Sequence, residues 1–320
     1  YGLSLTNFSF SGYGTYNQLF ATLFFCLAIG HCKHILEKRH HAILAGLFFS
    51  VTLLSHIMTG YFAFLWIAVD LALDFVRRLK HRLHFRRSDL KNLLWFITTV
   101  ALTSAHWILP MAIDGPQQHH SPIEPATKWT GIGAQAMIDT ITQGNLLDGG
   151  RFPTLTLLAA LGFCIAVSRA MRRRDGQRMV LNRLWLQTIL WIVLSFGPFT
   201  WGPMLWILPF ANHLHWHRFF AVSEFALCLC SGIALAWFIQ NALKKLPFAV
   251  VCSAIAILFL SPLIERSGYF LKTNVRWMKD TVEKWNDPAN EYKTTVDFAL
   301  KNQDARFAPG SHYDWGKTLL

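Results

Sequence analysis

Four polar or cationic side chains gather within residues 212–220, NHLHWHRFF, directly before a long apolar run. They are His213, His215, His217 and Arg218. If the apolar run is a helix, its first backbone N–H groups and the positive end of its dipole form an anion site. The fork of Arg218 suits phosphate oxygens, and His217 can donate a further hydrogen bond. The pattern therefore indicates binding of a lipid-linked phosphate at membrane level, with an interfacial anchor that touches lipid headgroups as the alternative.

The same histidines raise the question of zinc binding. In a helix, His213 and His217 would share one face while His215 points away, and in a strand all three would align. Neither arrangement brings a carboxylate or thiolate ligand from nearby in the sequence. We therefore expect no metal at this site and no cofactor other than the donor substrate itself.

Glu224 lies six residues after Arg218, about one and a half turns into the expected helix. A carboxyl group at that depth must be paired, protonated or exposed to a wet cavity. One interpretation is that Glu224 neutralises Arg218 or a group on a neighbouring helix. The other is that it acts as a general base or cation anchor that opens to the outer side of the membrane.

Two further histidines fall where turns on the same side are expected. His56 sits within SHIMTG, Ser55–Gly60, and His106 lies near the end of an apolar run. Together with the 213–217 group they would line a polar vestibule, although histidine is also common at membrane interfaces. The candidate catalytic residues are therefore Glu224 and His56, and the candidate substrate-binding residues are Arg218, His217, His215, His213 and His106.

The composition is typical of a membrane protein. Of the 320 residues, 53% are hydrophobic and only 15% are charged, whereas a soluble domain has about 25% charged residues. The net charge of +12 comes from short basic clusters between apolar runs, which is a topology signal rather than a surface for nucleic acid. No Walker A loop, GxGxxG, HExxH or GxSxG motif is present, so nothing favours a soluble nucleotide-dependent enzyme.

The apolar runs predict an all-α polytopic bundle of about eight membrane spans. As one helix, residues 42–76 would be about 52 Å long, against a hydrocarbon core of about 30 Å, so this run should fold back at Ser55–Gly60. A polar loop is expected over 111–151, and the stretch before His213 is too broken by prolines to span. The predicted spans are 16–30, the two halves of 42–76, 92–110, 152–168, 184–198, 219–240 and 247–264.

Charge gives the orientation. Residues 31–41, 77–91, 169–183 and 241–246 hold more than half of the 30 lysines and arginines, and they share one side only if 42–76 crosses twice. The positive-inside rule makes that side cytoplasmic. We expect a membrane domain over 1–264 and an outer amphipathic or soluble tail over 265–320 that starts a further domain. We expect the chain to be a fragment of a larger protein.

Acidic residues near the cytoplasmic side have an ordinary explanation. Asp70 and Asp74 are one turn apart, and Asp74 is four residues before Arg78, so an interfacial ion pair accounts for them. With the predicted boundaries, no lysine or arginine falls inside a span.

The order of these features resembles that of bacterial multi-spanning proteins of the GT-C glycosyltransferase type. It is most similar to bacterial membrane proteins described as 6-pyruvoyl-tetrahydropterin synthase-related. The resembling stretches cover most of residues 8–240 and are FSFSGYGTYNQLFATLFFCLAIG, LFFSVTLLSHIMTGYFAFL, HWILP and HRFFAVSEFALCLCSGIALA.

The resemblance implies a polyprenyl-phosphate sugar donor on the non-cytoplasmic side, with Arg218 at the donor phosphate. It also implies an acidic catalytic base in the first outer loop. Residues 1–15 contain no aspartate or glutamate, so that loop would lie before Tyr1. No zinc triad or soluble β-rich core supports the pterin-synthase description.

The prediction is therefore a glycosyltransferase-like protein of the bacterial inner membrane that uses a lipid-linked sugar. Its partners would be the bilayer, that lipid and envelope-biosynthesis proteins, with no nucleic acid. The alternative is a non-enzymatic transporter, flippase subunit or assembly factor for envelope polysaccharide.

Overall fold

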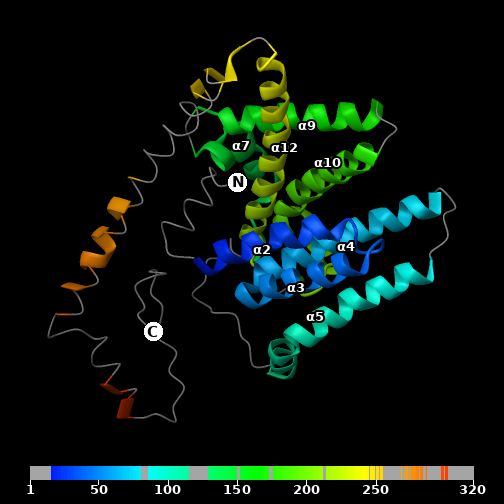
Figure 1. The fold of residues 1–320 in the computed structure, drawn as a ribbon. Coiled ribbons are helices and arrows are strands. Elements are labelled where there is room, and N and C mark those ends of the chain that lie inside the picture. Colours follow the sequence, from blue (N-terminus) through cyan, green and yellow to red (C-terminus); the bar gives the residue numbers. More distant parts are fainter. Residues whose placement is uncertain are drawn as a thin grey trace.

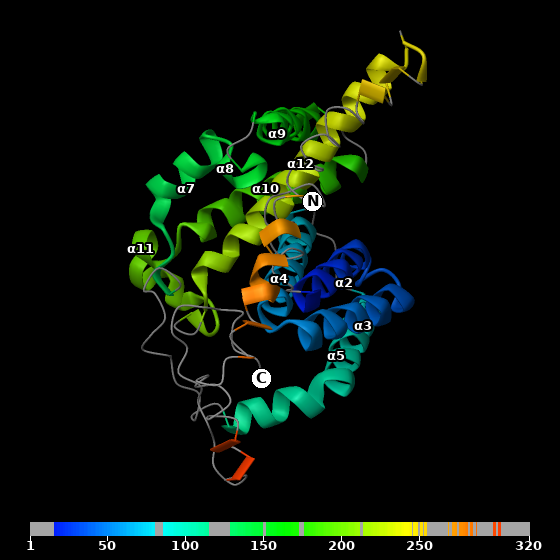
Figure 2. The same cartoon turned by 90° about the vertical axis from the view of Figure 1, so that its left-hand side faces the viewer.

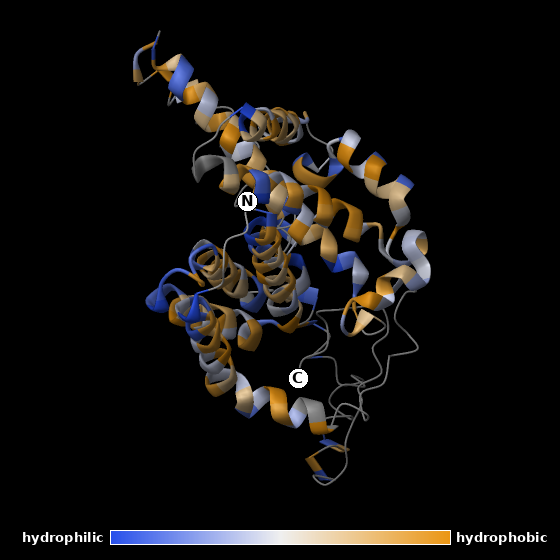
Figure 3. Cartoon of the chain, turned by 90° about the vertical axis from the view of Figure 1, so that its right-hand side faces the viewer, coloured by the Kyte–Doolittle hydropathy of each residue, from blue (hydrophilic) through white to orange (hydrophobic). Residues whose placement is uncertain are grey.

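The structure is a computed structural model that describes residues 16–80, 86–114, 129–149, 152–172, 176–211 and 214–244, with scattered positions from 246 to 301. Within these residues every regular element is a helix and none is a strand, which confirms the all-α prediction. Hydrophobic residues dominate the helices (Figure 3). Most of the predicted tail, 265–320, lies outside the described residues.

The helices form two groups along the chain (Figure 1). The first group contains α2 (Tyr16–Cys32), α3 (Arg39–Ser55), α4 (Ile57–Lys80) and α5 (Arg87–Asp114). The second group contains α7 (Gly133–Thr142), α8 (Asn145–Asp148), α9 (Thr154–Arg172), α10 (Gly176–Ser195), α11 (Gly197–Trp201), the 3-10 helices η2 (Gly202–Ile207) and η4 (Trp216–Arg218), and α12 (Phe219–Ala242).

Four of the described helices are long and apolar enough to cross a membrane: Ile57–Lys80, Arg87–Pro110, Thr154–Arg172 and Trp216–Ala242. A fifth crossing results if the pair Met179–Ser195 and Gly197–Ile207, bent by 83°, counts as one span. Helices α2 and α3 coincide with predicted spans but are only 17 residues long, short of the roughly 20 residues that a bilayer needs. Eight spans are therefore not confirmed, and most of the predicted eighth, 247–264, lies outside the described residues.

The break predicted inside 42–76 falls at His56. Helix α3 ends at Ser55 and α4 begins at Ile57, and His56 between them has an extended backbone with φ −159° and ψ 110°. Helices α3 and α4 pack against each other, so this single residue forms the turn between two neighbouring helices.

The prediction of a polar loop over 111–151 was wrong at several points. Helix α5 continues through Pro110 to Asp114, because a proline removes one helical N–H and its effect falls within a single turn. Helices α7 and α8 then occupy part of the same stretch, and the left-handed residues Gly144 and Gly149 flank α8.

An aromatic cluster joins the two groups of helices. Trp66 of α4 stacks on Trp191 of α10 with ring centroids 6.0 Å apart, and its ring edge meets Phe225 of α12 at 5.8 Å. Phe62 of α4 lies 5.0 Å from Phe219. These rings hold α4 against α10 and α12 and so fix the start of α12 beside the start of α4.

Small residues let α9 and α12 approach closely. Ala159, Gly162 and Ala166 are buried on α9, against Cys230 and Ala234 on α12. A Cβ atom at Gly162 would run into the carbonyl oxygen of Cys230. Close packing of small residues is a principal source of helix association in lipid.

A buried ionic cluster ties α4 to α10. Arg183 of α10, one residue before the predicted span 184–198, is only 9% exposed. Its Nη2 donates to Oδ1 of Asp74 at 2.9 Å, and Gln187 Nε2 donates to Oδ1 of Asp70 at 3.2 Å. The predicted Asp74–Arg78 pair is present at 3.7 Å. That pair alone does not account for the acids, since Asp74 also needs Arg183 to offset the cost of its burial.

Candidate functional site

Two of the predicted site residues meet across 162 positions of the chain. Nη1 of Arg218 lies 3.0 Å from Nε2 of His56. Arg218 closes η4 and precedes the first residue of α12, while His56 is the turn between α3 and α4. The aromatic cluster brings these two helix starts together, so the contact follows from packing that the sequence pattern does not reveal.

Both ring nitrogens of His56 face donors. Arg218 Nη1 faces Nε2, and the Thr59 backbone N–H donates to Nδ1 at 3.2 Å, with the Thr59 hydroxyl 2.9 Å from the same nitrogen. A neutral imidazole accepts at only one nitrogen, so these two donors compete for the ring. Burial, and to a smaller extent the charge of Arg218, lower the pKa of His56 to about 4. At neutral pH His56 is therefore an uncharged acceptor that orients Arg218, and its engaged lone pair suits positioning better than proton abstraction.

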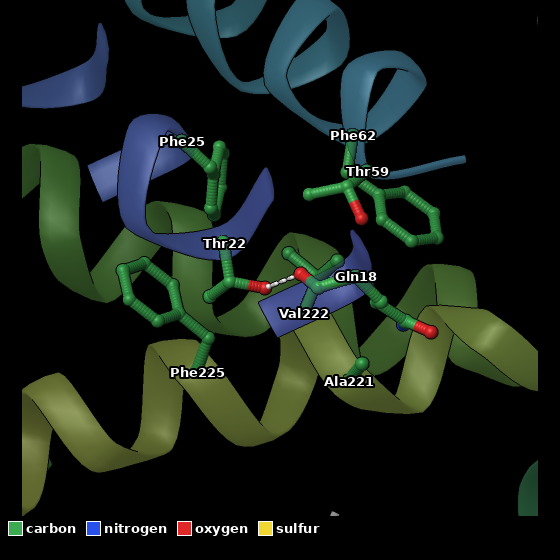
Figure 4. A pocket seen from close by; sticks show the side chains of 8 residues that line it. All are labelled: Gln18, Thr22, Phe25, Thr59, Phe62, Ala221, Val222 and Phe225. Carbon is green, nitrogen blue, oxygen red and sulfur yellow. Dashed lines mark hydrogen bonds between the residues drawn. The ribbon is translucent and has the colours of Figure 1, made fainter. Parts of the chain in front are cut away.

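A pocket lies next to this pair, between α2, α4 and α12 (Figure 4). It is small, with a free volume of about 20 Å³, which is room for a group of about the size of a water molecule. Its lining consists of the polar residues Gln18, Thr22 and Thr59 and the apolar residues Phe25, Phe62, Ala221, Val222 and Phe225.

Thr59 connects the pocket to the Arg218–His56 pair. Its hydroxyl lies 2.9 Å from Nδ1 of His56, and its side chain lines the pocket. On the other wall, Ala221 and Val222 follow Arg218 by about one helical turn. The arrangement is an apolar pocket with a polar wall, beside a guanidinium at a helix N-terminus.

Glu224 and His56 do not line this pocket. Glu224 lies in α12, the helix predicted to carry it, and is fully buried at 0% exposure, although its neighbour Phe225 lines the pocket. His56 contacts the lining through Thr59. The catalytic roles predicted for both residues stay predictions.

The other candidate histidines do not lie in one place. His215 packs its ring edge-on against Trp129 at 4.4 Å and lies 5.7 Å from the ring of His217, so the two form a row of rings just before Arg218. His106 is exposed on α5, which packs on α3 and lies apart from α12 (Figure 1). His213 lies outside the described residues. Across the described part of the chain, no three histidine, cysteine or acidic side chains are grouped so that they could hold a metal ion.

The sequence reasoning missed Thr59, Gln18 and the pocket itself. Thr59 follows His56 by three residues, the spacing at which side chains at a helix start meet. Gln18 is a buried polar residue, 7% exposed, at the start of the apolar run that forms α2. Both features are visible in the sequence, but they indicate a site only when the relative positions of the helices are known.

Comparison with known proteins gives no relative: no family model matches the chain, and neither a curated protein nor a solved structure matches it.

Proposed function

We propose that this chain is part of an integral membrane protein of the GT-C glycosyltransferase type. It would take a sugar from a polyprenyl-phosphate carrier at the non-cytoplasmic face of a bacterial inner membrane. The observation that carries the proposal is the contact between Arg218 and His56 beside an apolar pocket at the start of α12.

The chemistry of the pair suits a phosphate. His56 lies 3.0 Å from the guanidinium and is itself uncharged at neutral pH, so this contact orients Arg218 without neutralising it. The helix dipole of α12 adds to the attraction for an anion. Arg218 would therefore bind the phosphate, with His217 as its neighbour on the same turn.

The pocket lining supports binding of an apolar group beside a polar one, although a prenyl chain would have to widen a free volume of about 20 Å³. Phe25, Phe62 and Phe225 present aromatic rings, and Gln18 and Thr59 add polar atoms to the same lining. Ligand sites of this kind combine an apolar lining with a few placed polar groups.

Binding of undecaprenyl phosphate to the purified protein in nanodiscs, with undecaprenol as the uncharged control lipid, tests the proposal. We expect the wild type to prefer the phosphate and Arg218→Ala to lose at least tenfold in affinity for it, since hydrogen bonds to charged groups contribute about 1.5–3 kcal/mol. Arg218→Lys should retain part of the preference, and Lys244→Ala, at the far end of α12, should bind as the wild type. Equal binding of phosphate and alcohol by the wild type would contradict the proposal.

A second measurement separates the transferase from its alternative. The protein is given a polyprenyl-phosphate sugar labelled in the sugar, and movement of the label off the lipid is followed. Binding with transfer supports the glycosyltransferase, whereas phosphate-dependent binding without transfer supports a transporter, flippase subunit or assembly factor.

A further inference from the structure

Residues 197–210, GPFTWGPMLWILPF, carry no charge and expose an unusual amount of apolar surface. Five large side chains of this segment are at least two-thirds exposed: Phe199 at 76%, Met204 at 72%, Trp206 at 68%, Ile207 at 87% and Phe210 at 73%. Helix α11 lies at the margin of the molecule (Figure 2). Several large apolar side chains exposed within one short segment are a feature of binding or membrane faces.

The chain turns sharply between α10 and this segment. The axes of Met179–Ser195 and Gly197–Ile207 differ by 83°. Gly197 has φ +66°, and a Cβ atom there would lie 2.8 Å from the carbonyl oxygen of Thr130, so the turn needs glycine. The chain therefore bends aside where α10 ends.

The opposite side of the segment is fixed to the rest of the protein. Leu205 is buried at 6% exposure. The Thr200 hydroxyl accepts from the Ala134 N–H at 2.8 Å, and Trp201 Nε1 donates to the Val193 carbonyl at 2.8 Å. The Tyr61 hydroxyl donates to the Pro209 carbonyl at 2.8 Å. The exposed side chains thus belong to the outer side of an anchored segment.

We propose that residues 197–210 are a re-entrant segment that lies in one leaflet at the membrane interface, with these five side chains in the lipid acyl region. This inference rests on the membrane setting of the proposed function but needs neither its donor nor its reaction. At 14 residues the segment is too short to cross a bilayer.

Three observations favour lipid over a protein partner. The segment forms a bent apolar pair with α10 and precedes α12, which is long and apolar enough to span a membrane, so its exposed face adjoins a membrane-spanning helix. His215, His217 and Arg218 follow within a few residues, as in a headgroup zone. Its backbone also bonds locally, from Leu208 N–H to the Leu205 carbonyl at 2.9 Å and from Ala211 N–H to the Leu208 carbonyl at 3.3 Å. Lipid demands such local bonding.

Spin labels in a variant without native cysteines, reconstituted in phosphatidylcholine vesicles, test the placement. The label is attached at Ile207→Cys and, as an independent site, at Phe199→Cys. Leu102→Cys, 77% exposed on α5, is the deep control, and Glu37→Cys, 46% exposed between α2 and α3, is the water control. The readout is accessibility to oxygen relative to a water-soluble nickel chelate.

We expect the ratio of oxygen to nickel accessibility at 207 and 199 to exceed that at 37 at least fivefold and to stay below that at 102. A water-like ratio at both sites overturns the inference. Spin–spin broadening at 207 that disappears on dilution with unlabelled protein also overturns it, because a second copy then covers the face. If position 102 is water-like as well, the membrane setting itself fails. If the protein does not prefer the phosphate lipid but position 207 has a lipid-like accessibility ratio, the proposed function fails and this inference stands.

Discussion

The charged and polar residues of this chain find their partners over long distances in the sequence. Arg218 and His56 are 162 residues apart, and Arg183 and Asp74 are 109 apart. Spacing along one helix indicates the pairs of Asp74 with Arg77 and Arg78, but neither of these two long-range contacts. The sequence did place Arg218 and His56 on one side of the bundle, but their contact depends on the packing of α4 against α12.

The lowered pKa of His56 predicts a pH dependence of stability. Between about pH 4 and pH 6.5 the unfolded chain binds a proton at this histidine and the folded protein does not. Unfolding therefore takes up a proton, and stability falls as the pH drops through this window, with no contribution above it. Melting of the detergent-solubilised protein between pH 7.5 and 4.5 should fall more steeply for the wild type than for His56→Asn. Parallel curves would show that His56 does not titrate in this way.

Replacement of Arg183 should destabilise the fold strongly. Arg183→Leu removes the cationic partner on α10 from the buried carboxylates of Asp70 and Asp74. Breaking a buried ion pair costs roughly 3–5 kcal/mol, less what Arg77 and Arg78 still supply to Asp74. We expect a clear drop in melting temperature, partly restored by adding Asp74→Asn. Arg172→Leu, at the exposed end of α9, is the control and should melt as the wild type. If both arginine variants melt alike, the cluster is not a source of stability.

At the scale of elements, the contact between α9 and α12 makes a sharp prediction. Gly162→Ala places a methyl group against the backbone of Cys230, which cannot yield as a side chain could. Overpacking of this kind costs about 1–3 kcal/mol or more, so the melting temperature should fall. Gly232→Ala on α12, where a Cβ atom meets nothing within 4 Å, should be neutral or slightly stabilising. Equal effects of the two changes would mean that α9 and α12 are not closely packed.

Hydropathy located most of the helices but not all of their ends. Seven of the eight predicted spans fall on described helices, and the turn at His56 falls inside the predicted SHIMTG. Helix α5 extends past Pro110, where the sequence predicted its end. Helix α10 begins before the predicted residue 184, and Arg183 in this added part is neutralised by Asp74. Such ends depend on tertiary partners, which local hydropathy does not encode.

The candidate site was predictable to a smaller extent. The sequence identified Arg218 and His56 by their charge and position, whereas the pocket required the relative placement of α2, α4 and α12. Glu224 stood out as a carboxyl group in an apolar run, yet which side of α12 it would face could not be read from the run itself.

For the whole molecule, the charge pattern predicts opposite sides for the two ends of the second helical group. Single cysteines at Arg172 and His215, in a variant without native cysteines, should differ in labelling by a membrane-impermeant maleimide added to intact cells. Position 215 should react from outside and position 172 only after lysis, because basic loops stay in the cytoplasm. The reverse result would invert the topology and remove the proposed outer site.

The hydrogen-bond geometry of His56 links ligand occupancy to the first turn of α4. The Thr59 backbone N–H donates to Nδ1 at 3.2 Å, which makes His56 an N-cap-like acceptor for α4. Arg218 faces the other nitrogen, Nε2, and a neutral imidazole cannot accept at both. An anion that draws the guanidinium away would therefore leave the ring proton on Nε2 and strengthen the bond to α4. The nitrogen-15 shifts of this one imidazole would therefore report whether the neighbouring pocket is filled, and by thermodynamic reciprocity a firmer start to α4 would favour the bound anion.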